Sequence, residues 1–315
     1  MMNLEFKPLE AEDIGRLTKF YGIRPNKTCD SMVLDSFLWR EYYNVRFAIA
    51  DDRAALMRMT DDAVEFAAMP MCKEEDLPYY VNLLKEYFNK ELGRPLQIFL
   101  ADEEAVNYLK LPPEEFIVEE LDDAKDYLYS GDALRTLSGK KLHKKKNHLN
   151  AFLRQYEGRF EYRKLCCSDR LDVWNFLVDW RRQKGEIVDP HLDYEVRGIH
   201  EILKNCSILN VSMGGIYVDG KLEAFSIGSY NPLEKMAIIH IEKANADIPG
   251  LYQAINQMFL VHEFPQAELV NREDDMGLEG LRHAKMTYNP VGFARKYRIR
   301  QVFETGNARE ERPAQ

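Results

Sequence analysis

The stretch VNREDDMGLEGLRHAKMTY, residues 270–288, decides the fold class, because a short apolar strand runs into four charged residues and a glycine before a helix begins. In folds that alternate strands with helices, ligands gather where strands end and where the N–H groups of the next helix converge. We therefore expect a substrate-binding site between this strand and helix, at Asn271, Arg272, Glu273, Asp274 and Asp275. The alternative is that the acidic residues only cap the helix and complement its dipole.

Outside this stretch, the spacing of apolar residues predicts a similar order of elements in both halves of the chain. The first half is expected to hold strands at residues 44–50, 54–59, 64–69 and 96–100 and a helix at residues 77–92. In the second half we expect helices at 138–157, 171–184, 194–205, 251–263 and 278–286, and strands at 160–165, 208–218, 221–230, 236–243, 268–272 and 293–300. The sequence thus predicts an α+β fold of two similar units around one cleft, each a mixed, mainly antiparallel sheet flanked by helices.

A change in charge marks the expected boundary between the units. Residues 102–126 are rich in Asp and Glu, and a run of lysines follows from Lys140. Such an abrupt change, next to Pro112 and Gly131, is typical of a seam between domains. We predict an N-terminal domain over residues 1–128, a C-terminal domain over residues 129–303 that carries the site, and a flexible tail over residues 304–315.

The composition is that of a globular protein, because 315 residues with 45% hydrophobic and 30% charged side chains suffice for two domains. No signal peptide and no apolar run of about 18 residues occurs, so we expect a soluble, cytoplasmic protein. Five cysteines without a CxxC pair favour free thiols and no metal site, with Cys166 and Cys167 half-buried and inert. The net charge of -9 disfavours general coating of nucleic acid.

Five lysines crowd the start of the helix predicted at residues 138–157: Lys140, Lys141, Lys144, Lys145 and Lys146. An apolar stripe on the same helix is expected to enter the core: Leu142, Leu149, Phe152, Leu153 and Tyr156. The lysines repel one another, so an anionic partner such as phosphate or nucleic acid would stabilise them. They are candidate donor-binding residues. The alternative is a solvated face that balances the acidic segment before it.

The strand predicted at residues 236–243 carries polar residues among aliphatic neighbours. Alternation places Ile238, His240 and Glu242 on one face. A desolvated Glu242 is a candidate general base for acyl transfer with His240 beside it, although His240 could equally be a satisfied core histidine. Tyr288 is a candidate proton donor to a leaving group, and Lys285 is a candidate for binding the charge of that group.

The turn at residues 245–252 precedes a predicted helix, and free N–H groups at a helix start bind phosphate or carboxylate. Gly250 and Tyr252 therefore join the candidate donor-binding residues, although capping by Asp247 would explain the turn equally. The sequence contains no Walker sequence, GxGxxG fingerprint, HExxH spacing or Ser-His-Asp order. These absences exclude P-loop NTPases and the common zinc hydrolases and disfavour Rossmann dehydrogenases, which leaves group transfer without a metal.

Three blocks of sequence carry a family resemblance: GKKLHKKKNH at residues 139–148, NREDDMGLEGLR at residues 271–282 and KMTYNP at residues 285–290. With these blocks, nearly the whole chain resembles bacterial phosphatidylglycerol lysyltransferase C-terminal-domain-like proteins. The resemblance implies two tandem folds of the Gcn5-related N-acetyltransferase (GNAT) type, similar to aminoacyl-transferases that use charged tRNA to modify lipids or cell-wall peptides.

The resemblance also implies a transferase that moves an acyl or aminoacyl group from an activated donor, such as aminoacyl-tRNA, to an amine or hydroxyl acceptor. A phospholipid headgroup or a small molecule would be that acceptor. In acetyltransferases of this fold, the turn Arg/Gln-x-x-Gly-x-Gly/Ala cradles the pyrophosphate of coenzyme A; here Gly250 matches, and Tyr252 replaces the second small residue. One alternative is therefore an acyl-CoA-dependent N-acetyltransferase with coenzyme A or acetyl-CoA as cofactor. The other is a non-enzymatic module that binds tRNA or an anionic membrane through the lysine-rich helix.

Overall fold

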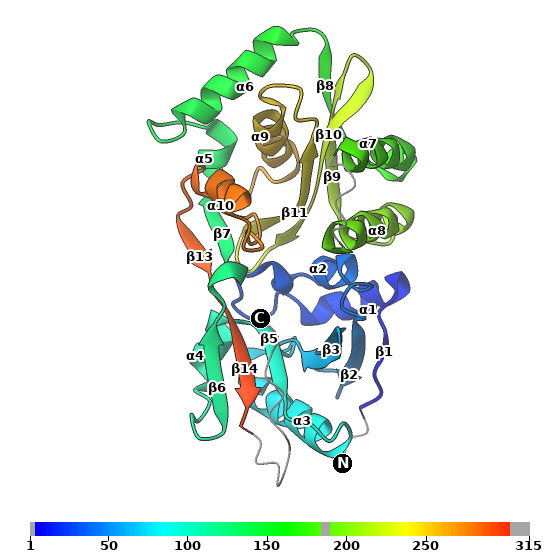
Figure 1. Ribbon diagram of the computed structural model, residues 1–315, viewed down its shortest axis with the longest axis vertical. Helices are drawn as coiled ribbons and strands as arrows, with labels where there is room; N and C mark the ends of the chain where they lie inside the picture. Colours follow the sequence, from blue (N-terminus) through cyan, green and yellow to red (C-terminus); the bar gives the residue numbers. More distant parts are fainter. Residues whose placement is uncertain (1–3, 184–189, 303–315) are drawn as a thin grey trace.

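The computed structural model describes residues 4–183 and 190–302, and the tail predicted over residues 304–315 lies outside them. Two seven-stranded sheets follow one another along the long axis of the molecule (Figure 1). Helices flank both sheets. The predicted α+β fold of two mixed, mainly antiparallel sheets is confirmed.

The first sheet, drawn in the lower part of Figure 1, is built mainly from the N-terminal part of the chain. In spatial order, its strands are β1 (Lys7–Pro8), β2 (Arg46–Ala50), β3 (Ala54–Asp61), β4 (Val64–Ala67), β5 (Gln97–Asp102), β14 (Lys296–Gln301) and β6 (Phe116–Glu120). Every neighbouring pair is antiparallel except β4 and β5.

The second sheet has the same number of strands and again one parallel pair. In spatial order, its strands are β13 (Gly292–Ala294), β7 (Asp126–Ser130), β12 (Leu269–Asn271), β11 (Met236–Ala244), β10 (Lys221–Asn231), β9 (Ser212–Val218) and β8 (Phe160–Lys164). The parallel neighbours are β11 and β12, and the other pairs are antiparallel.

The longer helices each bury one apolar face, as their spacing of apolar residues requires. The helices are α1 (Ile14–Leu17), α2 (Val33–Leu38), α3 (Leu77–Lys90), α4 (Glu103–Leu109), α5 (Gly131–Thr136), α6 (His143–Gln155), α7 (Arg170–Gln183), α8 (Pro190–Asn205), α9 (Leu251–Glu263) and α10 (Glu279–Met286). Helices α5, α6 and α9 lie on one side of the second sheet and α7 and α8 on the other (Figure 1). Within residues 4–183 and 190–302, no helix combines the length and apolar character needed to cross a membrane.

Both sheets contain one pair of parallel strands that part soon after they meet. In the first sheet, β4 pairs with β5 only at Ala67 and Ile98. In the second sheet, β11 and β12 pair at three positions, the last joining Ile238 to Asn271. Strands that diverge open a wedge in the sheet beyond the carboxyl ends of the paired segment, where such folds hold ligands.

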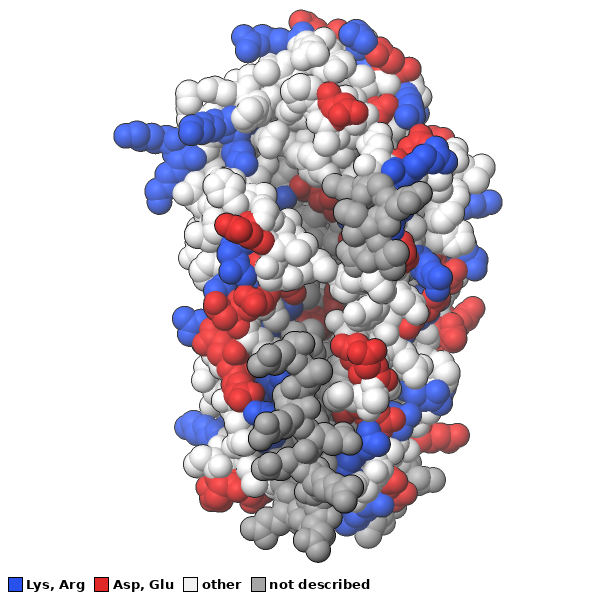
Figure 2. Space-filling view, viewed as in Figure 1, with Lys and Arg blue, Asp and Glu red and all other residues white. Residues whose placement is uncertain are grey.

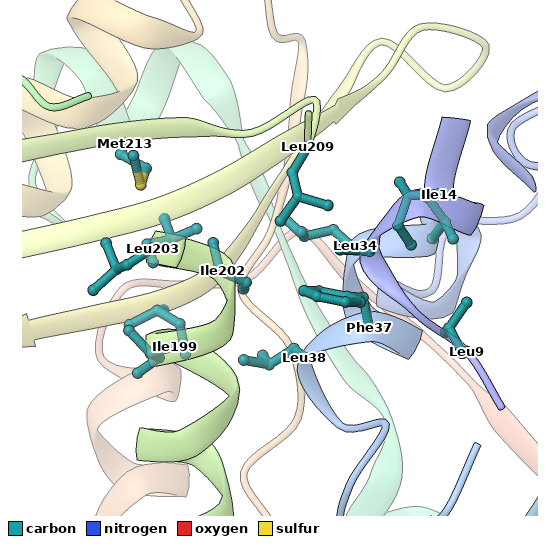
Figure 3. Close-up of a cluster of buried hydrophobic side chains, with 14 of the residues drawn as sticks. Leu9, Ile14, Leu34, Phe37, Leu38, Ile199, Ile202, Leu203, Leu209 and Met213 are labelled. Atoms are coloured by element: carbon teal, nitrogen blue, oxygen red, sulfur yellow. The ribbon is translucent and has the colours of Figure 1, made fainter. Parts of the chain in front are cut away.

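A shared hydrophobic core fixes the two units against each other. Side chains of α2 face side chains of α8 (Figure 3): Leu34, Phe37 and Leu38 face Ile199, Ile202 and Leu203. The helices approach so closely that a Cβ on Gly198 would lie 2.2 Å from the carbonyl oxygen of Leu38. Truncating a fully buried aromatic side chain such as Phe37 would cost about 3–5 kcal/mol. The relative placement of the units is thus set by close packing rather than by a flexible linker.

The structure corrects the prediction for the end of the chain. The single strand predicted at residues 293–300 is two strands, with β13 in the second sheet and β14 in the first. Strand β14 inserts between β5 and β6, so the C-terminal segment completes the N-terminal sheet. The boundary predicted near residue 128 falls within β7, a strand of the second sheet.

The prediction of free thiols is wrong for two cysteines, and the prediction that Cys166 is half-buried is also wrong. Cys167 and Cys206 are joined by a disulfide, and Cys166 is exposed. The turn after β8 lies against the end of α8, a contact between residues 39 positions apart in the sequence. Spacing along the chain does not reveal a pairing of this kind.

Candidate active site

A cavity of about 700 Å³ lies where the two wedges meet. Figure 2 shows a hollow on this face, with acidic side chains in its depth. The residues that follow the last parallel pair of each unit line the cavity: Ala68, Met69, Phe99 and Leu100 from the first unit, and Ile239, His240, Arg272 and Glu273 from the second. Each unit therefore contributes its wedge to one continuous space.

An ion pair between Glu242 and Arg272 forms one wall of the cavity. Oε1 of Glu242 accepts a hydrogen bond from Arg272 at 2.8 Å, and Oε2 accepts one from Asn256 at 2.9 Å. The Arg272 guanidinium lies 4.7 Å from the centre of the Tyr288 ring, and the Lys145 ammonium lies 4.2 Å from the same ring. Because both oxygens of Glu242 receive donors, this carboxylate holds Arg272 in place beside Tyr288.

Ser229, His240 and Glu273 form a hydrogen-bonded chain that ends at the cavity. Nε2 of His240 lies 2.8 Å from Oγ of Ser229, and Nδ1 lies 2.9 Å from Oε1 of Glu273. Burial lowers the pKa of His240, so the ring is neutral near neutral pH, and the tautomer that carries the proton on Nδ1 donates to the Glu273 carboxylate when this group is ionised. Burial, aided by the Asp126 carboxylate, raises the pKa of Glu273 well above its usual range. A carboxylate with a raised pKa is suited to take a proton near neutral pH.

Asp35 adds a second buried carboxylate next to Glu273. Its side chain is 9% exposed and lines the cavity, and nothing in the described part of the chain donates to its carboxylate. A carboxylate oxygen of Asp35, one of Glu273 and the Cys29 sulfur all lie within 4.8 Å of one another. Burial raises the pKa of Asp35 well above its usual range, and the Asp30 and Glu273 carboxylates add to this effect. A positively charged ligand group would relieve both burial and repulsion here.

Two buried lysines, Lys285 and Lys296, contact the acidic end of the cavity, the region around Asp30, Asp35, Asp126 and Glu273. The Lys296 ammonium lies 2.8 Å from an Asp126 carboxylate oxygen and 3.2 Å from the Cys29 sulfur. The Lys285 ammonium donates to the backbone carbonyls of residues 272–274 and so fixes the loop after β12. The spacing of Cys29 and its carboxylate neighbours would suit a metal ion, but the Lys296 charge beside the same thiol favours an ammonium group over a divalent cation.

The structure brings most of the predicted site residues to this cavity. Those that line it are the catalytic candidates His240, Glu242 and Tyr288, the donor-binding candidates Lys145 and Tyr252, and the substrate-binding candidates Arg272, Glu273, Asp274 and Lys285. The candidates that do not line it are Lys140, Lys141, Lys144, Gly250, Asn271 and Asp275. The three lysines are exposed on or just before α6, with Lys140 beside a second hollow of about 370 Å³. Thus α6 turns one lysine into the cavity and others toward solvent.

Asn271 and Asp275 are buried in the wall behind the site. The Asn271 amide donates to the Lys27 carbonyl at 2.8 Å and to Asp126 at 2.9 Å. The Asp275 carboxylate accepts from the Arg282 guanidinium at 2.8 Å and also from the Tyr127 hydroxyl. With these partners both residues hold the loop after β12 in its conformation.

Helix α6 packs closely on the turn before α9, where the resemblance would place the pyrophosphate of coenzyme A. Gly250 has a φ of +83°, and α6 passes so close that a Cβ at this position would lie 2.3 Å from the His148 carbonyl oxygen. The Leu251 N–H already donates to the Ile248 carbonyl at 3.2 Å. At Gly250 itself, a pyrophosphate would therefore meet the His148 carbonyl oxygen rather than an N–H donor.

Sequence reasoning missed five charged or thiol residues at the acidic end: Cys29, Asp30, Asp35, Asp126 and Lys296. They come from segments far apart in the sequence, so no local pattern joins them. One signal was available. Asp35 stands between Leu34 and Phe37 in a short apolar run, and a carboxylate among buried aliphatic residues points to a site because its burial must be compensated.

A comparison with known families agrees with this architecture. The family model described as phosphatidylglycerol lysyltransferase, C-terminal, matches residues 23–300. The chain belongs to this family. The predicted family resemblance is confirmed, and so are the two tandem GNAT-like folds.

Several proteins are similar to this member of the phosphatidylglycerol lysyltransferase C-terminal family in sequence or in structure. An uncharacterized protein of Mycoplasmoides gallisepticum is 26% identical over 186 residues, and the match spans 58% of this chain and 58% of that relative's length. A conserved protein of unknown function from Bacteroides thetaiotaomicron superposes with a TM-score of 0.84 at 27% identity, covering 95% of this chain and 100% of that chain. L-PGS from Bacillus licheniformis superposes with a TM-score of 0.68 at 13% identity, covering 95% and 94%. The last likeness shows a shared fold alone.

Proposed function

We propose that the protein transfers an aminoacyl group from an aminoacyl-tRNA to an amine or hydroxyl acceptor. The observation that carries the proposal is the buried Asp35 carboxylate, which has no partner among the described residues and lies beside Glu273 in the cavity. Every aminoacyl ester carries an ammonium group, and a lysyl ester carries two. An ammonium paired with Asp35 would compensate the burial of this carboxylate and leave Glu273 to act on the acceptor.

The neighbouring groups suit the chemistry of such a transfer. The Glu273 carboxylate, oriented by His240, takes the proton from the acceptor nitrogen or oxygen as that atom attacks the ester carbonyl carbon. The new C–N or C–O bond forms, the ester C–O bond breaks, and Tyr288 gives a proton to the leaving hydroxyl oxygen. Proton return from Glu273 to Tyr288 closes the cycle, so no proton is consumed. Arg272, held by Glu242, stabilises the negative charge that develops on oxygen.

Helix α6 supports a nucleic-acid donor. Lys140, Lys141, Lys144 and Lys146 are exposed, whereas Lys145 reaches the cavity at Tyr288. The blue patch at the upper left of Figure 2 marks cationic side chains projecting beside the hollow. A phosphate backbone bound on this surface would direct its aminoacyl end toward Tyr288, with an affinity that falls as salt rises. A tRNA donor would also place the protein in the cytoplasm.

The two alternatives remain distinguishable. An acyl-CoA-dependent N-acetyltransferase would need a pyrophosphate cradle, and the turn at Gly250 presents the His148 carbonyl instead. A non-enzymatic module that binds tRNA or an anionic membrane through α6 would need neither Asp35 nor Glu273. Loss of transfer without loss of binding in variants of these carboxylates therefore separates the enzyme from the module.

The test is a transfer assay with radiolabelled lysyl-tRNA and a pooled extract of lipids and small molecules as acceptor. We expect label to move from tRNA to the extract with the wild type, and transfer to fall in Asp35→Asn, Glu242→Gln and Lys144→Glu. Asp62→Asn is the matched control, because Asp62 is exposed in a turn with a positive φ that asparagine also adopts. No transfer by the wild type with lysyl-tRNA or alanyl-tRNA, or equal transfer by Asp35→Asn, would contradict the proposal.

A further inference from the structure

The two halves of the cavity occupy equivalent places in the two units. In the second unit, Ile239 and Arg272 directly follow the last parallel pair, Ile238 with Asn271. In the first unit, Ala68 and Phe99 directly follow the pair Ala67 with Ile98. Each sheet therefore contains one wedge between diverging parallel strands, and both wedges open into the cavity.

The two wedges differ in chemistry. The N-terminal half of the cavity is lined by apolar and aromatic side chains, among them Tyr43, Met59, Phe66, Met69, Phe99 and Leu100. Within residues 26–102, all of which the structure describes, no Lys or Arg lines the cavity. The Arg298 guanidinium lies 5.1 Å from the centre of the Phe99 ring but is not among the lining residues. Residues 26–102 thus line this half with apolar contact area and with the carboxylates of Asp30, Asp35 and Asp102, but with no cation.

Five lysines and arginines line the cavity: Lys145, Lys243, Arg272 and Lys285 from the second unit, and Lys296 from β14 of the first sheet. Lys145 lies over the Tyr288 ring, and Lys285 donates to backbone carbonyls. Lys243 pairs with Glu195 at 2.7 Å, and Arg272 pairs with Glu242 at 2.8 Å. Lys296 is held by Asp126. A phosphate buried in the N-terminal half would lose its hydration and meet carboxylates, because Lys296 is already paired with Asp126 and Asp30, and this is strongly unfavourable.

The backbone at this wedge is also unusual. Leu100 has a φ of +58°, a left-handed conformation that leucine adopts only at an energetic cost. The residue before Leu100, Phe99, packs edge-on against Phe66 with 5.5 Å between the ring centres. Phe66 in turn packs edge-on against Tyr43 with 6.1 Å between the ring centres. The strained residue and the connected rings shape an apolar surface at the point where the sheet opens.

We infer that the N-terminal half of the cavity binds the acceptor, and that this acceptor carries its amine or hydroxyl on a compact, uncharged apolar body rather than on a phosphate-bearing headgroup. The inference rests on the proposed function and deepens it by assigning the class of acceptor. The apolar body packs against Phe66, Met69 and Phe99, and the nucleophile points across the cavity toward Glu273. The apolar contact supplies binding, and the neighbouring carboxylates, with Lys296 already paired to Asp126, supply discrimination against phosphates.

The first experiment measures binding of N-phenyl-1-naphthylamine, a neutral aromatic probe that fluoresces in apolar sites. Ala68→Trp fills the N-terminal half and is expected to weaken probe binding about tenfold or more. Ala63→Trp is the matched control, because Ala63 is exposed in the turn between β3 and β4 and does not line the cavity. Leu100→Gly is a second variant that removes an apolar side chain while glycine suits the positive φ, so it is expected to fold and still to bind the probe less tightly.

Competition then identifies the class of acceptor. We expect 2-phenylethanol to displace the probe and glycerol 3-phosphate not to displace it. Displacement by glycerol 3-phosphate at lower concentration than 2-phenylethanol, or equal probe affinity in wild type, Ala68→Trp and Leu100→Gly, would overturn the inference. The proposed function can fail separately from the acceptor class. If the wild type binds the probe but transfers nothing from lysyl-tRNA, aminoacyl transfer is contradicted. If the wild type transfers the lysyl group but binds neither the probe nor 2-phenylethanol, only the acceptor class is contradicted.

Discussion

Asp35 on α2 and Glu273 after β12 hold carboxylate oxygens within 4.8 Å of each other, although more than two hundred positions separate them in the sequence. The Asp35 carboxylate is buried beside two other acidic side chains, and its pKa is raised as a result. An acid whose pKa is higher in the folded state destabilises the fold when it is ionised.

Asp35→Asn is therefore expected to raise the melting temperature near neutral pH, because it removes a buried negative charge, and to reduce transfer at least about tenfold by removing an ammonium ligand. Thermal unfolding and the lysyl-tRNA assay measure the two effects. Asp62→Asn should change neither. A lower melting temperature for Asp35→Asn would show that Asp35 stabilises the structure through a partner.

The transfer rate is expected to depend on pH through Glu273. Its pKa is raised mainly by burial, so the carboxylate is lost as pH falls through a value well above that of an exposed glutamate. The rate should rise with pH through that raised pKa and then level off. A pH-rate profile of the wild type measures this, and Glu273→Gln should be slow at every pH. A profile that falls as pH rises through the same range would exclude Glu273 as the base.

Coenzyme A and acetyl-CoA are expected to give no thermal stabilisation at millimolar concentration. A ligand at ~100 times its dissociation constant adds about 2.7 kcal/mol to the native state, a shift that a melting curve detects readily. We expect none because the Gly250 turn faces the His148 carbonyl oxygen. A saturable shift that disappears in a variant of the turn would restore the acetyltransferase alternative.

The Asp275 carboxylate is expected to stabilise the fold. Hydrogen bonds from Arg282, with others from Tyr127 and the Gly277 N–H, lower the pKa of Asp275 to about 2. The stabilisation is present above the unfolded pKa and is lost as pH falls through about 2. Asp275→Asn should lower the free energy of unfolding by about 2 kcal/mol at neutral pH, as measured by urea denaturation. The difference between variant and wild type should shrink as the pH approaches the folded pKa.

Because α2 and α8 are in close contact at Gly198, adding one methyl group there is expected to lower the free energy of unfolding strongly. Gly198→Ala would place its Cβ against the Leu38 carbonyl oxygen and should destabilise the protein by about 2 kcal/mol. Gly280→Ala in α10 is the matched control, because nothing lies within 4 Å of its added Cβ. This control should be neutral or stabilising by up to about 1 kcal/mol, since alanine favours a helix. Equal stability of the two variants would mean that α8 shifts freely on α2.

Much of the fold could be predicted from the sequence because long elements have regular periods. The hairpin of β2 and β3, helix α3 and helix α9 all lie where apolar spacing predicts them. Helix α2 was missed because six residues are too few for a helical period to emerge. The split into β13 and β14 was missed because both strands form one continuous extended pattern, and only tertiary pairing assigns each to its sheet.

The site was predictable only in part, for a related reason. His240, Arg272 and Glu273 stand on or directly after strands whose pattern is clear, so their convergence follows from the fold. Asp35 lies at the cavity because α2 packs against α8. Lys296 lies there because it is the first residue of β14, whose position in the first sheet depends on long-range pairing. Contacts between units decide these positions, and no spacing within one unit encodes them.

The insertion of β14 between β5 and β6 sets the order in which the protein becomes complete on the ribosome. Strands β1 to β5 emerge early, yet the edge of β5 stays unpaired until residues 296–301 have been made, after the whole second sheet. During that interval the nascent first sheet exposes an open edge to other chains, as unpaired strands do. Strand β14 therefore completes the first sheet last. A chain that stopped before β14 would lack the strand between β5 and β6 and would also lack Lys296, which pairs with Asp126 beside the cavity.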